Sequence, residues 1–595
     1  MALLEFRNLG IATEAAPGHP ARQIVRDISF TLEAGNVIAL IGESGSGKTT
    51  IGLSALGHTK PGLAFSGGQV LLDGQDILRL PAGKLRALRG ADVCYVAQSA
   101  AAAFNPSMRI MDQIIESAVL HGRASADEAR TRALALNRLV QLPDPDHVGD
   151  RFPHQVSGGQ LQRLMLVMAL CSRPRLLILD EPTTALDVTT QILVLRSIKD
   201  AIIHTGTAAI IVSHDLAVVS QIADDIVVLR GGQICEVEPT AQILHNPKHD
   251  YTKELLAANS TKPLSPPAAT GGQDLLKVSG LAAGYSSRVR VLHDVDLSVA
   301  HGEIVAVIGE SGSGKSTMAK VIAGLAPRIG GKIELRDTAL APHVGARSRD
   351  QLRRIQYVPQ MADTSLNPQQ TIAQILSRPL RFFGRTSRRA LPDKVTQILR
   401  QMHLDERFAT RRPANMSGGQ KQRVNLARAM AAEPELLICD EVTSALDTVI
   451  AERIVRLLAD LRREQQVSIL FISHDISTVS ELADRIVVLY GGWVVETGTR
   501  DEVLGRPRHP YTRLLLTSTP ELRQGWLDEA CDADAVKSAQ TPVPGAASTA
   551  GCPFFARCPL AEPGRCDLSV PAPFAISDSH AIRCHVEADR PDHAE

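Results

Sequence analysis

LIGESGSGKTT (Leu40–Thr50) contains the phosphate-loop pattern G-x-x-x-x-G-K-[ST], and VIGESGSGKST (Val307–Thr317) contains it again. Each copy follows a short apolar run and opens a helical pattern, the context in which this motif cradles phosphate. Glycines let successive backbone N–H groups turn toward a phosphate, and the helix N-terminus adds partial positive charge. We therefore expect two nucleotide-binding loops, formed by Gly42, Gly45, Gly47, Lys48, Thr49 and Thr50 and by Gly309, Gly312, Gly314, Lys315, Ser316 and Thr317.

The repeat extends well beyond these loops. VSGGQLQR (Val156–Arg163) returns as MSGGQKQR (Met416–Arg423), LLILDEPTTALD (Leu176–Asp187) as LLICDEVTSALD (Leu436–Asp447), and IVSHD (Ile211–Asp215) as FISHD (Phe471–Asp475). The offset is 267 residues at the glycine loops and 260 from Ser157 onward, so the halves are homologous. We predict a first domain over 1–258, a flexible linker rich in Pro, Ser and Ala over 259–274, a second domain over 275–520 and a C-terminal extension over 521–595.

Short apolar runs alternate with helical patterns in both halves, as at VIAL (Val37), LLIL (Leu176) and IVVL (Ile226). Runs of this kind suit strands that are buried on both faces. The pattern predicts an α/β fold in which each half has a mostly parallel sheet core, with a small cysteine-rich extension after the second half.

Composition excludes several classes of protein. Among 595 residues, 64 Lys and Arg balance 64 Asp and Glu, so the basic excess typical of a nucleic-acid binder is missing. No stretch approaches the ~18 to 20 apolar residues of a membrane helix, and MALLEFRNLG does not resemble a signal peptide. The sequence indicates a cytosolic protein without a membrane span.

Carboxylates that end buried strands supply the second half of each site. We expect Asp180 and Asp440, with the hydroxyls of Thr49 and Ser316, to hold the Mg²⁺ shell, while the two loop lysines reach the β- and γ-phosphates. The adjacent Glu181 and Glu441 are placed to orient and deprotonate an attacking water. His214 and His474 follow apolar strands at the same offset, which favours a γ-phosphate contact over a purely structural role.

Together, these paired motifs resemble the ATP-binding cassette (ABC) ATPases over residues 1–520. The resemblance implies two composite ATP sites, in which the SGGQ segment of one half closes over ATP held by the other half. Gln98 and Gln360 match the glutamine loop that senses Mg²⁺ and couples to a membrane partner, and Asp187 and Asp447 match the loop that communicates between sites. The implied nucleotide contacts from the SGGQ segments are Ser157, Gly158, Gly159 and Gln160 and, in the second half, Ser417, Gly418, Gly419 and Gln420.

The two halves differ where adenine would stack. Tyr285 matches the family's adenine-stacking aromatic residue, whereas Thr13 holds the corresponding position in the first half. Stacking of this kind is worth ~1 to 3 kcal/mol. We therefore expect adenine to stack on Tyr285 in the second half, and whether the first half stacks adenine without an aromatic residue stays open.

Two further paired motifs narrow the resemblance. One pair is FNP (Phe104–Pro106) and SLNP (Ser365–Pro368), and the other is NPKHDYTKELL (Asn246–Leu256) and RPRHPYTRLLL (Arg506–Leu516). They resemble segments of the ATPases of oligopeptide, dipeptide, glutathione and nickel importers, here with both subunits fused in one chain. The resemblance implies a peripheral protein at the cytoplasmic face of the bacterial inner membrane. Its partners would be two integral-membrane permease subunits and a periplasmic or surface substrate-binding protein, without nucleic acid.

Two alternative functions remain open. A twin-cassette ATPase acting on ribosomes typically has a long charged linker, which is not found here, and fused sugar-importer ATPases usually have one decayed site, whereas both sites here are complete. A DNA-repair ATPase with zinc modules inside its cassettes is disfavoured, because the clustered cysteines lie outside the cassettes.

Four of the nine cysteines crowd into the last 44 residues: Cys552, Cys558, Cys566 and Cys584. Their intervals are longer than the two to four residues usual for a zinc pair. Four thiolates on loops of uneven length can enclose a [4Fe–4S] cluster, and the tail resembles the extension of the peptide-importer ATPases. We predict an iron–sulfur cluster with a structural role, with zinc or free thiols as the alternatives.

Overall fold

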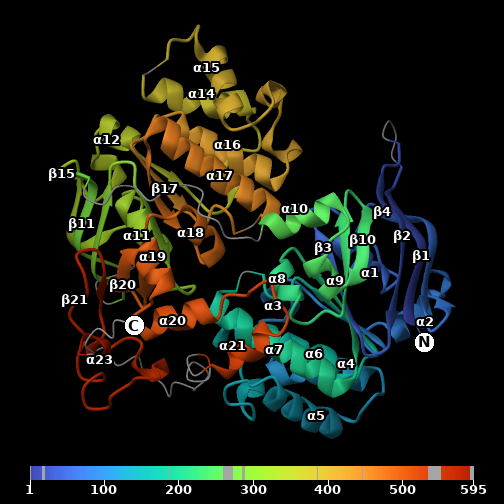
Figure 1. Cartoon of the computed structure of the whole chain (residues 1–595). Coiled ribbons are helices and arrows are strands. Elements are labelled where there is room, and N and C mark those ends of the chain that lie inside the picture. The colour runs from blue at the N-terminus through green and yellow to red at the C-terminus, as the bar shows by residue number, and fades with distance from the viewer. Residues whose placement is uncertain are drawn as a thin grey trace. The chain divides into compact units, whose positions relative to one another are not determined.

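The computed structural model describes residues 2–15, 20–184, 186–258, 272–284, 289–384, 386–444, 446–533, 536 and 551–589 (Figure 1). The chain divides into two compact units. Unit 1 comprises Met1–Ser260, Asp447–Val449 and Ser518–Ala533, and unit 2 comprises Thr261–Leu446, Ile450–Thr517 and Asp534–Glu595. Most of the predicted linker lies outside the described residues.

A six-stranded sheet forms the centre of unit 1, in the order β10-β9-β3-β8-β7-β6. Its strands are parallel except for β10, which pairs with β9 in the antiparallel sense at one edge. Strands β3, β7 and β8 are buried along their whole length, as their apolar runs predict. Because these strands are parallel, the phosphate loop, Asp180 and His214 follow their carboxyl ends at one edge of the sheet.

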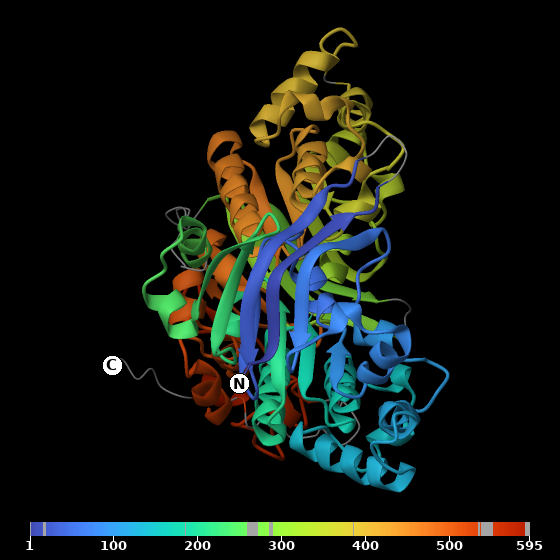
Figure 2. The same ribbon diagram turned by 90° about the vertical axis from the view of Figure 1, so that its right-hand side faces the viewer.

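A second, antiparallel sheet in the order β2-β1-β4-β5 accompanies this core, and its long strands run side by side (blue in Figure 2). Helices α4, α5 and α6 pack together in the same unit. The elements of unit 1 are β1 (Ala2–Thr13), β2 (Gln23–Glu33), β3 (Val37–Gly42), α1 (Lys48–Ser54), β4 (Leu63–Leu72), β5 (Gln75–Asp76), α2 (Ala82–Leu88), β6 (Val93–Val96), α3 (Ala100–Ala103), α4 (Ile110–Leu120), α5 (Ala126–Leu139), α6 (Gly158–Cys171), β7 (Leu176–Asp180), α7 (Val188–Thr205), β8 (Ala208–Ser213), α8 (Leu216–Val219), β9 (Asp225–Arg230), β10 (Gln233–Pro239), α9 (Thr240–His245), α10 (Asp250–Ala258) and α21 (Trp526–Asp532).

Unit 2 repeats this plan, with a sheet in the order β12-β11-β14-β15 and a longer sheet in the order β16-β17-β18-β13-β19-β20-β22-β21. Its elements are β11 (Asp274–Gly284), β12 (Arg290–Ala300), β13 (Ile304–Ile308), α11 (Lys315–Ile322), β14 (Arg328–Leu335), β15 (Thr338–Ala339), α12 (Arg349–Arg354), β16 (Ile355–Val358), α13 (Ala362–Ser365), α14 (Ile372–Phe382), α15 (Leu391–Gln401), α16 (Gly418–Met430), β17 (Leu436–Asp440), α17 (Thr448–Gln465), β18 (Ser468–Ile472), α18 (Ile476–Leu482), β19 (Arg485–Tyr490), β20 (Trp493–Thr499), α19 (Arg500–Gly505), α20 (Pro510–Thr517), β21 (Phe574–Ala575), β22 (Ala581–Ile582) and α23 (His585–Ala588). The α/β prediction, with a mostly parallel core in each half, is confirmed, and the antiparallel sheets are an addition to it.

The C-terminal part of the chain contributes to both units. In unit 1, the Asp528 carboxylate on α21 accepts hydrogen bonds from Arg196 at 2.8 Å and Lys199 at 2.7 Å, both on α7. In unit 2, β22 pairs with β20 and lengthens the sheet. Among the described residues, no helix is both long and apolar enough to cross a membrane.

Candidate active site

Each phosphate loop joins the end of a buried strand to the start of a helix. In unit 1 the loop runs from Gly42, the last residue of β3, to Lys48, the first of α1. Gly47 has φ +95°, and a Cβ there would lie 2.9 Å from Val25 Cγ2. Gly314 has φ +105°, and a Cβ there would lie 2.7 Å from Leu292 Cδ2. Both positions therefore require glycine.

The loop lysines fold back over their loops. Lys48 Nζ donates to the carbonyls of Gly42 at 2.6 Å and Glu43 at 2.9 Å, and Lys315 Nζ makes the corresponding bonds to Gly309 at 2.7 Å and Glu310 at 2.8 Å. Burial lowers the pKa of Lys48, although nearby carboxylates oppose this shift. The sequence-predicted Gly45, Thr50, Gly312 and Thr317 lie in the same loops or in the first helical turns after them.

Two buried hydroxyls support a phosphate in these loops. Ser46 Oγ and Ser313 Oγ are enclosed, and neither has a hydrogen-bond partner within the described part of the chain. Buried polar groups without partners are rare and costly, so each hydroxyl fits a loop whose ligand completes it. The residues present therefore fit a nucleotide phosphate.

The predicted magnesium ligands converge in each unit. Thr49 Oγ1 donates to Asp180 Oδ1 at 3.0 Å, and Ser316 Oγ donates to Asp440 Oδ1 at 2.8 Å. Burial raises the pKa of Asp440. A hydroxyl beside a strand-end carboxylate is the oxygen set that Mg²⁺ takes with a nucleotide.

Sequence reasoning missed one partner of each aspartate. The Tyr95 hydroxyl donates to Asp180 Oδ2 at 2.8 Å, and Tyr357 donates to Asp440 Oδ2 at 2.7 Å. Burial raises the pKa of both phenols, so each stays a donor. A signal was available, because each tyrosine stands three residues before the predicted glutamine in VCYVAQ and IQYVPQ.

The predicted catalytic glutamate of unit 1 contacts two other predicted site residues. Gln98 Nε2 donates to Glu181 Oε2 at 2.8 Å, and His214 Nδ1 lies 3.4 Å from Glu181 Oε1. Burial alone raises the pKa of Glu181, but the His214 contact, Thr184 and Lys48 leave it below its usual value. Burial lowers the pKa of His214, and the Glu181 interaction overcomes this and raises it.

Unit 2 repeats the arrangement. Gln360 Nε2 donates to Glu441 Oε2 at 2.7 Å, and His474 Nδ1 lies 3.6 Å from Glu441 Oε1. Interaction with His474 holds the pKa of Glu441 below its usual value despite burial, and the pKa of His474 is raised. Glu181 and Glu441 have φ of 48° and 49°, a strained conformation for a non-glycine residue that is common at functional sites.

The SGGQ segments form helix starts. Ser157 Oγ accepts from the Gln160 amide at 3.3 Å, and Gln160 Oε1 accepts from the Ser157 amide at 3.0 Å. Ser417 and Gln420 form the same capping box at the start of α16. These glutamine side chains are thus engaged with their own helices. The N-termini of α6 and α16 still present the amides and partial positive charge suited to an anion.

The second glycine of each SGGQ segment allows close packing. A Cβ on Gly159 would lie 2.1 Å from Thr190 Cγ2, and a Cβ on Gly419 would lie 2.3 Å from Ile450 Cγ2. Gly158 has open space at that position, and Gly418 makes only an ordinary contact. The predicted nucleotide role of Gly159 and Gly419 is therefore accompanied by a packing role.

The remaining predicted residues are Asp187 and Asp447, which both make hydrogen bonds to backbone amides, and Tyr285. Asp187 caps α7 by accepting from the Thr190 amide at 3.0 Å, and Asp447, which belongs to unit 1, accepts from the Ser44 amide at 3.4 Å. Tyr285 lies outside the described residues, so the prediction about adenine stacking there stays a prediction.

The four clustered cysteines share one small region of unit 2. The Cys552 amide donates to the Cys566 carbonyl at 2.7 Å. Burial raises the pKa of Cys552 to about 11 and that of Cys558 to about 12, with smaller contributions from neighbouring thiols, including Cys584. Within the described ranges, however, no three His, Cys, Asp or Glu side chains are arranged to hold a metal ion. The arrangement does not support the predicted metal site.

Comparisons with known proteins show which sequence families this chain resembles. A family model described as "ABC transporter" matches residues 25–184 and 292–444, and "Oligopeptide/dipeptide transporter, C-terminal region" matches 235–273 and 495–566. The glutathione import ATP-binding proteins GsiA of Shigella dysenteriae serotype 1 and Escherichia coli K12 are each 36% identical over 545 residues, covering 83% of this chain and 86% of theirs.

One solved structure shares the fold across both halves. It is the archaeal ribosome recycling factor aABCE1, in complex with the ribosomal stalk protein aP1. The match has a TM-score of 0.53 and 19% identity, and covers 80% of this chain and 86% of that one. At this identity the likeness concerns the fold alone.

Proposed function

This chain belongs to the ABC transporter family of ATP-binding proteins, and we propose that it hydrolyses ATP to energise the import of peptides or of a related solute such as glutathione. The observation that carries the proposal is the joint occurrence of two intact sets of Lys, Asp, Glu and His with two matches to the oligopeptide/dipeptide transporter C-terminal region.

ATP would be held in both units by the same types of residue. The loop amides and Lys48 or Lys315 bind the phosphates, while Thr49 with Asp180, or Ser316 with Asp440, holds Mg²⁺. Bound magnesium neutralises charge on the phosphate oxygens. Gln98 and Gln360 lie beside the glutamates and would complete the magnesium shell when the ion is bound.

Glu181 and Glu441 are the proposed general bases. A depressed pKa keeps each carboxylate ionised at neutral pH and able to accept a proton from water. His214 and His474 orient the glutamates through their close contacts and contact the γ-phosphate. We propose composite sites, in which Ser157–Gln160 act on ATP held by Lys315 and Ser417–Gln420 act on ATP held by Lys48.

Transport requires partners. We propose that the chain associates peripherally with the cytoplasmic face of the membrane by docking onto two permease subunits, with a substrate-binding protein delivering the solute. The C-terminal region match supports the peptide class of importer. Dipeptides, oligopeptides, glutathione and nickel are the candidate solutes.

Uptake by a deletion strain tests this assignment. Cells that lack the chain are offered labelled peptides, glutathione, nickel and a sugar in turn, with and without the restored gene. Restored uptake of a peptide or glutathione supports the proposal. Restored uptake of sugar alone, or a ribosome defect with every uptake normal, contradicts it.

The cysteine-rich tail carries a separate proposal, a [4Fe–4S] cluster bound by the thiolates of Cys552, Cys558, Cys566 and Cys584. The four cysteines in the last 44 residues and the resemblance of the tail to the peptide-importer extension support it, whereas the described side chains are not arranged as a metal site. A bound cluster would have to draw the four thiols together, and it would stabilise the thiolates that burial disfavours. Protein purified without oxygen should be brown and contain iron and sulfide at about four each per chain. Colourless protein with one zinc, or with no metal, contradicts this proposal.

A further inference from the structure

An arginine in the cysteine-rich tail contacts the phosphate loop of unit 2. Arg557 donates through both terminal nitrogens to the Glu310 carboxylate, each at 2.8 Å. The two side chains are 19% and 16% exposed, and the guanidinium lies over the rings of Tyr490 and Phe554. Two parallel, largely buried bonds make this a strong and oriented ion pair.

Glu310 is part of the phosphate loop itself. Its amide donates to the Tyr511 hydroxyl at 2.7 Å, and its carbonyl accepts from Lys315 at 2.8 Å. Movement of this residue would therefore also move an acceptor of the lysine that binds phosphate. The contact with Arg557 fixes the side chain of Glu310. The tail therefore restrains the loop at a third point, in addition to the bonds to Tyr511 and Lys315.

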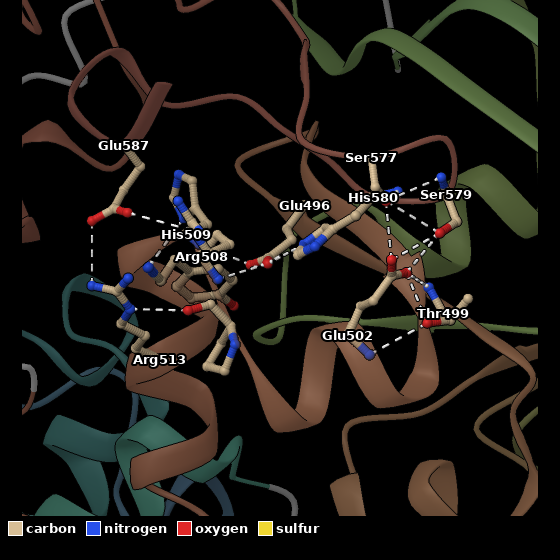
Figure 3. Close-up of polar contacts among 12 residues, drawn as sticks. Glu496, Thr499, Glu502, Arg508, His509, Arg513, Ser577, Ser579, His580 and Glu587 are labelled. Carbon is tan, nitrogen blue, oxygen red and sulfur yellow. Dashed lines mark hydrogen bonds and ion pairs between the residues drawn. The ribbon is translucent and has the colours of Figure 1, made fainter. Parts of the chain in front are cut away.

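The tail is well anchored where it makes this contact. His580 Nε2 lies 2.8 Å from Glu496 Oε1 in a buried pair, and Ser577 and Ser579 donate to Glu502 (Figure 3). Arg513 pairs with Glu587 at 3.4 Å. These contacts and the pairing of β22 with β20 hold the tail on the same unit as the loop.

In unit 1 a different cation lies beside the phosphate-loop glutamate. Glu43 holds the position of Glu310 and forms a long ion pair with Arg230 at the end of β9, at 3.8 Å, in which the arginine is half exposed. The position of Arg230 corresponds to Tyr490 in unit 2, at the end of β19. Arg230 stacks on Tyr251, just as Arg557 lies over aromatic rings. In unit 2 a tyrosine holds the equivalent position, and the tail supplies the cation through Arg557.

We propose that Arg557 is a positioning residue for the second ATP site, through which the docked tail sets nucleotide affinity at the Lys315 loop and not at the Lys48 loop. Without the guanidinium, the Glu310 carboxylate stays beside the triphosphate site with its charge no longer balanced by this bidentate pair. Repulsion of phosphate then weakens binding. This inference rests on ATP binding by the second loop, and it is independent of the transported solute.

Equilibrium binding of a fluorescent ATP analogue to the full chain tests it. In a Lys48→Ala background, which leaves the second loop as the reporter, Arg557→Ala should raise the dissociation constant about tenfold, equivalent to ~1.4 kcal/mol. Adding Glu310→Gln should restore most of the affinity, because it removes the unbalanced charge. A purely structural role for Arg557 predicts no such rescue.

Matched variants complete the test. In a Lys315→Ala background, Arg557→Ala should leave the first site unchanged, and Arg230→Ala should change it less than about twofold, because its pair is long and exposed. Unchanged affinity in Lys48→Ala/Arg557→Ala, or equal loss with and without Glu310→Gln, overturns the proposal. If Lys48→Ala/Lys315→Ala still binds the analogue fully, the assignment of the ATP sites fails instead.

Discussion

At the scale of single residues, the sequence repeat identified most of each site, since Lys, Asp, Glu, Gln and His recur at fixed offsets. The repeat also contains Tyr95 and Tyr357, but a tyrosine on a strand usually indicates packing, so the sequence alone does not predict their bonds to the aspartates. Arg557 could not be found in this way. Its partner Glu310 is 247 residues away, and tertiary structure alone brings the two together.

The tyrosines give a prediction at this scale. Tyr95→Phe or Tyr357→Phe removes one hydrogen bond that orients a magnesium-binding aspartate and leaves the ring in place. We expect the Mg²⁺ concentration for half-maximal ATP hydrolysis to rise about tenfold, the usual cost of losing an outer-shell partner of a metal ligand. An unchanged Mg²⁺ titration in both variants would refute this role.

At the scale of elements, the parallel core followed from apolar runs, and each SGGQ segment became a helix start through its Ser–Gln capping box. The antiparallel sheets were less evident. Their strands, such as β1 and β11, are only partly apolar, and their burial depends on the neighbouring sheet. The β22 pairing involves two residues, too short a strand for a sequence pattern to reveal.

Packing of α16 against α17 gives a prediction about glycine. Gly419→Ala places a Cβ against Ile450 and should lower the free energy of unfolding of unit 2 by about 1 to 3 kcal/mol. Gly418→Ala is the matched control, because its Cβ meets only Leu446 Cδ2 at 3.8 Å. Urea unfolding compares the two, and equal stability of both variants would argue against close packing at Gly419.

Burial of His509, between α19 and α20 and beside Phe554 of the tail, predicts a pH effect. Burial lowers the pKa of His509 to about 4, whereas an unfolded histidine titrates near ~6.5. The unfolded state therefore binds a proton first as pH falls. Stability is fully present above pH ~6.5 and declines toward pH ~4, by about 2 kcal/mol between pH 7 and pH 5.

Trp493, which stacks on His293 in unit 2, can report this loss. In a Trp526→Phe background it is the single tryptophan, and its fluorescence follows urea unfolding at each pH. His509→Asn should remove the acid-sensitive part of the free energy of unfolding. The matched control is His249→Asn, at the exposed equivalent position in the first half, which should leave that part in place. Equal pH dependence of the parent and His509→Asn would contradict the assignment to His509.

At the scale of the whole molecule, the chain is a repeated cassette to which unequal C-terminal segments are added. Ser518–Ala533 packs within unit 1 through Asp528, and the following tail extends the sheet of unit 2. The predicted boundary at residue 520 falls inside the first of these segments. Composition alone could not locate it, because α21 has the ordinary mixture of apolar and charged residues of a surface helix.

Each unit holds the full proposed catalytic set of Lys, Asp, Glu and His, so we expect hydrolysis in both cassettes. The most direct measurement is the ATP turnover of the chain assembled with its permease and binding protein, together with solute uptake. Glu181→Gln and Glu441→Gln should each reduce turnover at the altered site by ~10² to 10⁴-fold and abolish most uptake. Wild-type turnover and uptake in either variant would contradict the account, because that site would then not be hydrolytic.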